Sequence, residues 1–168
     1  MDSVHAGDSE KTGVGICKRF RPDFRKFRRR HFRFVFRRFG LNYLLDTSVF
    51  LFACVSPEKL SSRQSKILSD PKSNLLLSIA SVWEMQIKMR IGKLEVKDGL
   101  QVFLGRAKTQ LGLNYLPIRV DHILEESELP NIHSDPFDRL LLSQARLEGV
   151  PIITSDKIFR KYKGNFVF

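Results

Sequence analysis

Cysteine is scarce in this sequence, with only Cys17 and Cys54 among 168 residues. The two thiols give neither a metal-ligand spacing nor a disulfide framework. This scarcity suits a protein of the reducing cytosol. We expect Cys17 to be a thiol outside the fold and Cys54 to be a small core residue.

Long apolar runs are also absent. No segment approaches the roughly 20 apolar residues that a membrane-spanning helix needs, and the N-terminus lacks the apolar region of a secretory signal peptide. These two absences predict a cytoplasmic protein with no membrane partner.

Several common catalytic motifs are missing too. The sequence has no P-loop, no Gly-rich dinucleotide fingerprint, no His-Glu-x-x-His, no Cys-x-x-Cys and no Gly-x-Ser-x-Gly elbow. These absences count against nucleotide, zinc-protease and serine-hydrolase chemistry. The four histidines show no ligand spacing among themselves, and His133 fits a surface position at least as well as the rim of a site.

Positive charge is abundant but unevenly placed. Residues 1–40 hold 12 Lys/Arg against 4 Asp/Glu, whereas residues 41–168 hold 17 against 14. The tract CKRFRPDFRKFRRRHFRFVFRRFG (17–40) contains half of the 14 phenylalanines. It is either a basic amphipathic arm for RNA or an anionic membrane, or an extension outside the fold. Such an extension is either disordered or the result of a start codon assigned upstream of the one that the cell uses. We favour the extension over the arm.

From Leu41 onward, short apolar segments alternate with helical patterns, and the length suffices for one domain with a full core. The strand candidates are residues 42–46, 74–78, 114–118, 150–155 and 165–168. The expected helices are 47–55, 58–69, 80–91, 98–111, 120–128, 136–148 and a short one at 156–162. This alternation predicts an α/β domain with a mainly parallel sheet at residues 41–168.

The stretch HSDPFDRLLLSQA (133–145) contains a carboxylate in an unusual position. Asp135 and Pro136 form an ordinary helix start. Asp138 shares a helical face with Leu141 and Leu142, so its carboxylate lies at the end of an apolar stripe. A charge withdrawn from water needs a cation, several donors or a metal. The alternative is an acid at the third helical position that helps to cap the helix and complements its dipole.

Three further acids have both an ordinary and a functional explanation. Asp46 ends the first strand and can cap the next helix. Glu84 has capping-box spacing from Ser81, yet it also lies on an apolar helical face. Asp156 follows a strand and can be a turn residue or a helix cap. Each position is therefore uninformative when it is taken alone.

The joint placement of Asp46, Glu84, Asp138 and Asp156 carries more information. All four fall after strands or in the first turns of helices at the sheet edge where open α/β folds bind ligands. Four converging carboxylates would repel one another unless a cation lay among them. Such ligands suit Mg²⁺ or Mn²⁺, and the cluster suits metal-assisted phosphodiester hydrolysis.

The runs YLLDTSVFLF, LLLSIASVWEMQIKMRIGKLEV, HSDPFDRLLLSQARLEGVPIITSD and FRKY resemble, in that order, the PIN-domain ribonucleases and most closely the VapC-type toxins of type II toxin–antitoxin systems. The resemblance covers residues 42–168. It implies a three-layer α/β/α sandwich and a Mg²⁺- or Mn²⁺-dependent endoribonuclease that cuts structured RNA such as a tRNA or rRNA loop. It also implies a homodimer and a small antitoxin partner.

The resemblance assigns roles by position. Asp46, Glu84 and Asp138 match the three core acids of the family, and Asp156 matches a more variable fourth. The supporting residues that it indicates are an additional acid and two hydroxyl groups beside the metal, namely Asp135, Thr47 and Thr154. Arg139 is predicted to contact RNA phosphate or antitoxin, although the helical pattern also permits plain solvent exposure.

The N-terminus departs from the family pattern, because 45 residues precede Asp46 where the toxins have only a few. A start at Leu41 would make this aspartate the sixth residue, which supports a mis-assigned start for residues 1–40. A second function stays open, namely a non-catalytic RNA-binding or assembly module with the same fold. The presence of all four acids argues against it.

Overall fold

The computed structural model describes residues 41–168, so the predictions for the basic tract and for Cys17 lie outside the described residues. The strands are β1 (Leu41–Leu45), β2 (Ser73–Ser78), β3 (Asn114–Leu116), β4 (Ile152–Ile153) and β5 (Phe166–Val167). The α-helices are α2 (Thr47–Val55), α3 (Ser62–Ser69), α4 (Ile79–Arg90), α5 (Gly99–Leu111), α6 (Val120–Ser127) and α7 (Pro136–Glu148). Two 3₁₀ turns, η1 (Pro57–Lys59) and η2 (Lys157–Lys161), complete the fold.

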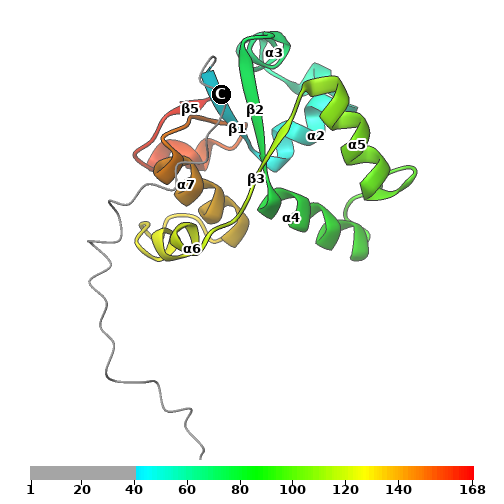
Figure 1. Ribbon diagram of the computed structural model, residues 1–168. Coiled ribbons are helices and arrows are strands. Elements are labelled where there is room, and N and C mark those ends of the chain that lie inside the picture. Colours follow the sequence, from blue (N-terminus) through cyan, green and yellow to red (C-terminus); the bar gives the residue numbers. More distant parts are fainter. Residues whose placement is uncertain (1–40) are drawn as a thin grey trace, which may run out of the picture. The chain divides into compact units, whose positions relative to one another are not determined.

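The five strands form one sheet in the order β3-β2-β1-β4-β5, and every neighbouring pair is parallel (Figure 1). The near-continuous leucine and isoleucine runs of β1, β2 and β4 are typical of strands that are buried on both faces. The carboxyl ends of parallel strands share one edge, and β1 lies at its centre. The prediction of a mainly parallel α/β sheet is confirmed.

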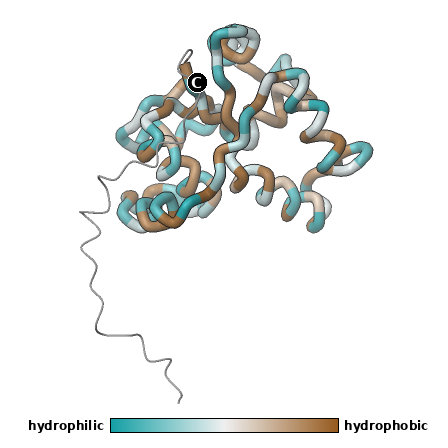
Figure 2. Tube along the Cα trace, viewed as in Figure 1, coloured by the Kyte–Doolittle hydropathy of each residue, from teal (hydrophilic) through white to brown (hydrophobic). Residues whose placement is uncertain are grey.

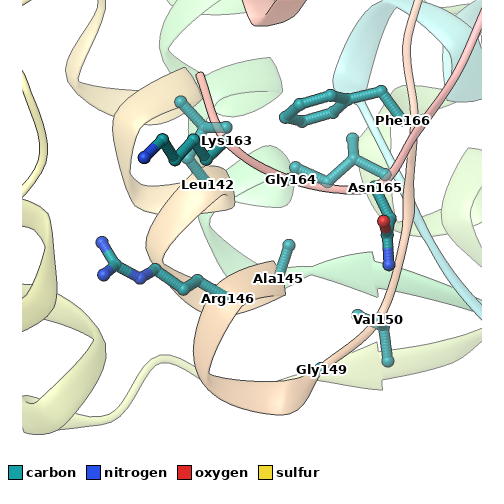
Figure 3. A pocket seen from close by; sticks show the side chains of 10 residues that line it. Leu142, Ala145, Arg146, Gly149, Val150, Lys163, Gly164, Asn165 and Phe166 are labelled. Carbon is teal, nitrogen blue, oxygen red and sulfur yellow. The ribbon is translucent and has the colours of Figure 1, made fainter.

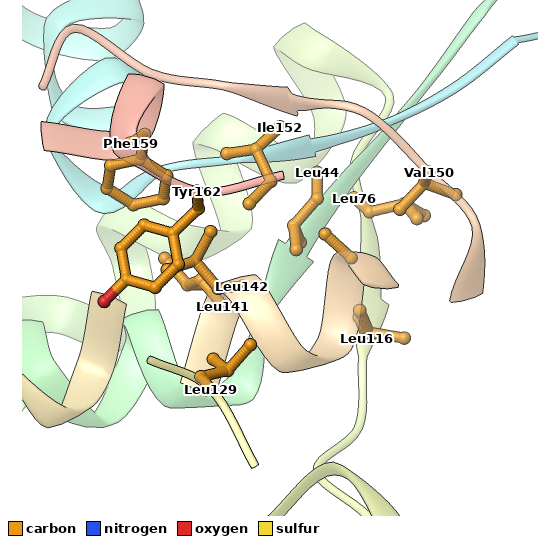
Figure 4. Packing of buried hydrophobic residues seen from close by; sticks show 11 residues of the cluster. Leu44, Leu76, Leu116, Leu129, Leu141, Leu142, Val150, Ile152, Phe159 and Tyr162 are labelled. Carbon is orange, nitrogen blue, oxygen red and sulfur yellow. The ribbon is translucent and has the colours of Figure 1, made fainter. Parts of the chain in front are cut away.

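Alternate side chains of each strand enter two separate cores. Leu44, Leu76 and Ile152 pack on one face with Leu141 of α7 and with Phe159 of η2 (Figure 4). The opposite face packs against helices α2, α4 and α5 and is completed by side chains of α3. Figure 2 shows the apolar stretches of β1 and β2 running through the middle of the described chain. Helices therefore cover both faces, which confirms the predicted α/β/α sandwich.

Cys54 lies at the rim of the second core. Its side chain is partly buried against that cluster, as expected for a small core residue. Burial raises the pKa of its thiol to about 11, so the sulfur is a packing group at neutral pH.

Most predicted element boundaries differ from the structure by one or two residues, and two elements differ more. The helix expected at 58–69 is a 3₁₀ turn followed by α3, because Ser61 and Gln64 form a capping box that starts a new helix. The strand expected at 150–155 is reduced to β4, although Pro151 O and Thr154 N still bond to the neighbouring strands. At the end of α7, Gly149 adopts φ 68° as the expected left-handed cap.

Within residues 41–168, no helix combines the length and the apolar character that crossing a membrane requires.

Candidate metal centre

Asp46 lies at the centre of the carboxyl edge of the sheet. Its backbone N–H donates to Ile153 O at 3.0 Å, while its side chain caps α2 by accepting from the N–H of Ser48. The Ser48 hydroxyl donates to Oδ2 at 2.9 Å, and the Thr154 hydroxyl donates to the same oxygen at 2.7 Å. Burial raises the pKa of Asp46, and the charge of Glu84 raises it further, against the effect of these hydrogen bonds.

Glu84 projects from α4 toward α2. The hydroxyl of Thr47 donates to Glu84 Oε2 at 2.6 Å, and the Lys88 ammonium lies 2.5 Å from Oε1. The alternative of a capping box with Ser81 is wrong, because Ser78 caps α4 and the helix begins at Ile79. Glu84 is therefore a buried acid inside the helix rather than a capping group.

Lys88 is a member of this region that the sequence did not reveal. Burial lowers its pKa, but the hydrogen bond with Glu84 and the charges of Asp135 and Asp138 outweigh burial and raise it. A lysine that is one helical turn after an acid is usually a surface pair, so only the fold shows that this ammonium faces the acid cluster.

Asp138 occupies the third position of α7. Asp135 caps the helix by accepting from the N–H of Phe137 at 2.8 Å, as predicted. Within the described chain, the polar partner of the Asp138 carboxylate is Nε2 of His133 at 3.1 Å, not a helix N–H. Burial, followed by the charges of Asp46 and Asp135, raises the pKa of Asp138 to about 7, although His133 acts in the opposite direction. A carboxyl this perturbed is typical of a functional site.

Asp156 both caps a turn and faces the other acids. Its Oδ1 accepts from the N–H of Ile158 at 2.8 Å, which starts η2. Its Oδ2 lies 3.2 Å from Nε2 of His133. Its own N–H donates to the Thr154 hydroxyl, the group that also holds Asp46. Thr154 thus connects two of the predicted site acids.

His133 is the main site residue that the sequence left undecided. It is buried, and its ring nitrogen lies between the carboxylates of Asp138 and Asp156. The alternative of a surface histidine is wrong. Its place two residues before Asp135 suggested the rim of a site, but the partner 23 positions later was not recognisable in the sequence.

The acids lie near one another at the sheet edge, but of the described residues only three offer atoms within a common metal-binding distance. His133, Asp138 and Asp156 each offer an atom that could bind a metal, and these atoms lie within 4.8 Å of one another. Asp46 and Glu84 lie close enough for their charges to raise the pKa of Asp138. Carboxylate oxygens whose charged forms destabilise one another are suited to a divalent cation such as Mg²⁺ or Mn²⁺.

The structure does not bring Arg139 to the acids. Its guanidinium forms an ion pair with Glu126 and donates to the carbonyl oxygens of Glu126, Leu129 and Pro130. The side chain is only 11% exposed, so it joins α7 to the end of α6. The alternative of plain solvent exposure is wrong, and a contact with RNA or antitoxin stays a prediction.

A hollow at the opposite end of α7 has different chemistry. It is lined by Ala145, Arg146, Gly149, Lys163 and Phe166, among others (Figure 3). No Asp or Glu of the described chain lines it, so it offers no carboxylate ligand for a divalent metal. The candidate metal ligands lie instead at the carboxyl edge of the sheet.

Comparison with known proteins identifies the family of the chain. The family model of the PIN domain matches residues 43–165. The chain belongs to the PIN domain family. A search of curated proteins finds no match.

Solved structures share the PIN fold with this chain at low sequence identity. VapBC2 of Rickettsia felis, bound to a DNA fragment from its promoter, matches with a TM-score of 0.60 and 16% identity, over 76% of this chain and 98% of that one. VapBC-1 of nontypeable Haemophilus influenzae matches with a TM-score of 0.53 and 18% identity, over 76% of this chain and 97% of that one. VapBC-5 of Mycobacterium tuberculosis, a member of the VapBC family of toxin–antitoxin systems, matches with a TM-score of 0.50 and 15% identity. The match covers 76% of this chain and 97% of that one.

Proposed function

We propose that this PIN domain is a divalent-metal-dependent endoribonuclease that hydrolyses phosphodiester bonds of RNA. The observation that carries the proposal is the convergence of four carboxylates at the carboxyl edge of a parallel sheet, with the pKa of Asp138 raised to about 7. Acids that are destabilised in their charged form and lie at this edge favour binding of a cation, and the bound cation would in turn attract a phosphate ester.

The four acids Asp46, Glu84, Asp138 and Asp156 would hold Mg²⁺ or Mn²⁺. When bound, the metal lowers the pKa of a water and stabilises charge on the leaving oxygen. The protein contributes the arrangement of the acids, since the hydroxyls of Thr154 and Thr47 hold the carboxylates of Asp46 and Glu84 at 2.7 and 2.6 Å. Lys88 places a positive charge beside Glu84.

We further propose that the protein is the toxin of a toxin–antitoxin pair and acts in the cytoplasm on a tRNA or rRNA. The similarity in fold to the VapBC structures supports this role. On this proposal, the chain forms a homodimer and is inhibited by a small antitoxin protein. An acid cluster that is compact and partly buried could be blocked by a short segment of such a partner.

The metal requirement can be tested directly. We expect the purified full-length protein to cleave RNA in the presence of Mg²⁺ or Mn²⁺, to stop in EDTA and to resume when excess metal is added, because the acids need the cation to generate the nucleophile. Fragment analysis of an end-labelled tRNA and rRNA mixture is the measurement. Cleavage that persists in EDTA contradicts the acid-cluster mechanism, and a folded protein that binds RNA without cutting it supports the RNA-binding alternative.

The basic tract has a separate test. We expect deletion of residues 1–40 to leave RNA cleavage and antitoxin binding unchanged, because the acids and both cores lie within residues 41–168. Cleavage rates and RNA affinities of the two chains should be compared at physiological salt. A loss of RNA affinity larger than about tenfold would show that the tract is an electrostatic contact.

A further inference from the structure

Neighbouring groups hold the ring of His133 in one orientation. The N–H of Asp135 donates to Nδ1 at 3.0 Å, and the ring packs edge-on against Phe159 with centroids 6.0 Å apart. The His133 backbone N–H donates to the Tyr162 hydroxyl at 2.8 Å, and that hydroxyl donates to Pro130 O. The ring is buried, so these contacts leave it little freedom to turn.

The contact at Nδ1 determines which ring nitrogen carries the proton. A backbone N–H can only donate, so Nδ1 of His133 must accept from Asp135 through its lone pair. The ring proton is therefore on Nε2. Nε2 lies 3.1 Å from Asp138 Oδ2 and 3.2 Å from Asp156 Oδ2, so one N–H is shared between two carboxylates.

The same contact makes Nε2 a poor metal ligand. Coordination through Nε2 would require its lone pair, and the proton would have to move to Nδ1. Nδ1–H would then point at the N–H of Asp135, and both the hydrogen bond and the support of the ring would be lost. The three groups that lie within 4.8 Å of one another thus include one hydrogen-bond donor and two candidate ligands.

We propose that His133 is a positioning residue that holds Asp138 and Asp156 together through its Nε2–H and does not itself coordinate the metal. This inference rests on the proposed metal-dependent function and refines it. Asp138 lies on α7, whereas Asp156 lies on the turn before η2 with a side chain that is 36% exposed. Two carboxylates on separate elements repel each other, and a shared donor offsets that repulsion and prepares the pair for a cation.

Nitrogen NMR of the imidazole rings in the full-length protein tests the inference, with Mg²⁺ as the probe because it is diamagnetic. We expect His133 to keep the Nε2–H tautomer both without metal and at saturating Mg²⁺. The signals of His133 are those that disappear in His133→Gln. His122 provides an internal control, since its Nδ1 also accepts from a backbone N–H, that of Arg119, and its Nε2 contacts Glu148, outside the acid cluster.

Two variants separate the donor from the ring. His133→Gln places an amide donor near the position of Nε2, whereas the shorter His133→Asn can accept from Asp135 but does not reach the carboxylates. The affinity of each variant for Mg²⁺ is obtained from the Mg²⁺-dependent rise in its melting temperature. We expect the affinity of the Gln variant to stay within about threefold of wild type and that of the Asn variant to fall about tenfold. Melting without metal shows whether both variants fold.

The possible results separate this inference from the proposed function. A move of the His133 proton to Nδ1 when Mg²⁺ is added would show a ligand and overturn the inference, as would a Gln variant that loses as much affinity as the Asn variant. If Mg²⁺ changes neither the spectrum nor the melting temperature of wild type, the metal-dependent function fails, and a positioning role for metal ligands fails with it. The tautomer without metal still shows whether the shared hydrogen bond exists.

Discussion

Replacing Asp46 by Asn is expected to reduce RNA cleavage by at least about 10²-fold while the fold stays intact. The carboxylate is buried at the centre of the sheet edge, and its charge is the property that a divalent cation would use. The amide oxygen of Asn can replace Oδ1 and accept from the Ser48 N–H, so the cap of α2 is kept. The amide NH₂ group takes the place of Oδ2 and can donate to the hydroxyl oxygens of Ser48 and Thr154. The loss should therefore appear in kcat rather than in stability.

Asp70→Asn is the matched control for this substitution. Asp70 is exposed, ends α3 and accepts from the N–H of Lys72 just before β2, at the amino edge of the sheet. The same chemical change there should leave cleavage unchanged. Single-turnover rates and melting temperatures of both variants decide the matter, and near-normal cleavage by Asp46→Asn would move the active site elsewhere.

The second large effect is expected for Asp138→Asn in metal binding. Metal that binds only the native state stabilises the wild type by mass action, by about 2.7 kcal/mol at a Mg²⁺ concentration of 100 times Kd. The variant should lose this stabilisation because its amide is a weak ligand for a hard cation. If Asp138 only capped α7, the variant would instead lose roughly 0.5–1 kcal/mol with or without metal, and the metal shift would survive.

The stability of the metal-free protein should also depend on pH, and the titration of Asp138 explains how. Its pKa is about 7 in the folded chain against the ordinary value of 3.8, because of burial and the charges of Asp46 and Asp135. The folded state therefore binds this proton more tightly than the unfolded state. The resulting stability is complete below about pH 4 and is lost as the pH rises through about 7.

Melting of the metal-free proteins between pH 4 and pH 8 measures this effect. We expect the wild type to lose stability over this range relative to Asp138→Asn, which has no carboxyl to titrate at this position. At pH 8 the variant should be the more stable of the two without metal and the less stable with Mg²⁺. Parallel pH profiles for the two proteins would contradict the assignment of Asp138.

Local patterns in the sequence determined the elements and several caps. The short apolar run that forms β1 and the cap formed by Asp135 and Pro136 depend on neighbours within a few positions, so they were predictable. Acids placed after strands likewise indicated the carboxyl edge of the sheet. The α/β class follows from such short-range information, and so does the proposed position of the site with its four candidate acids.

Contacts between distant segments were decided only by the tertiary structure. Thr154 bonds to Asp46 across 108 positions because β4 pairs with β1, and Thr47 bonds to Glu84 across 37 because α2 and α4 meet at the same edge. The periodicity of a sequence shows on which face of its own helix or strand a side chain lies. It does not show against which other helix or strand that face packs. That is why the place of His133 between two acids and the bonds of Arg139 to the end of α6 became evident only when the sheet order and the packing of α7 were known.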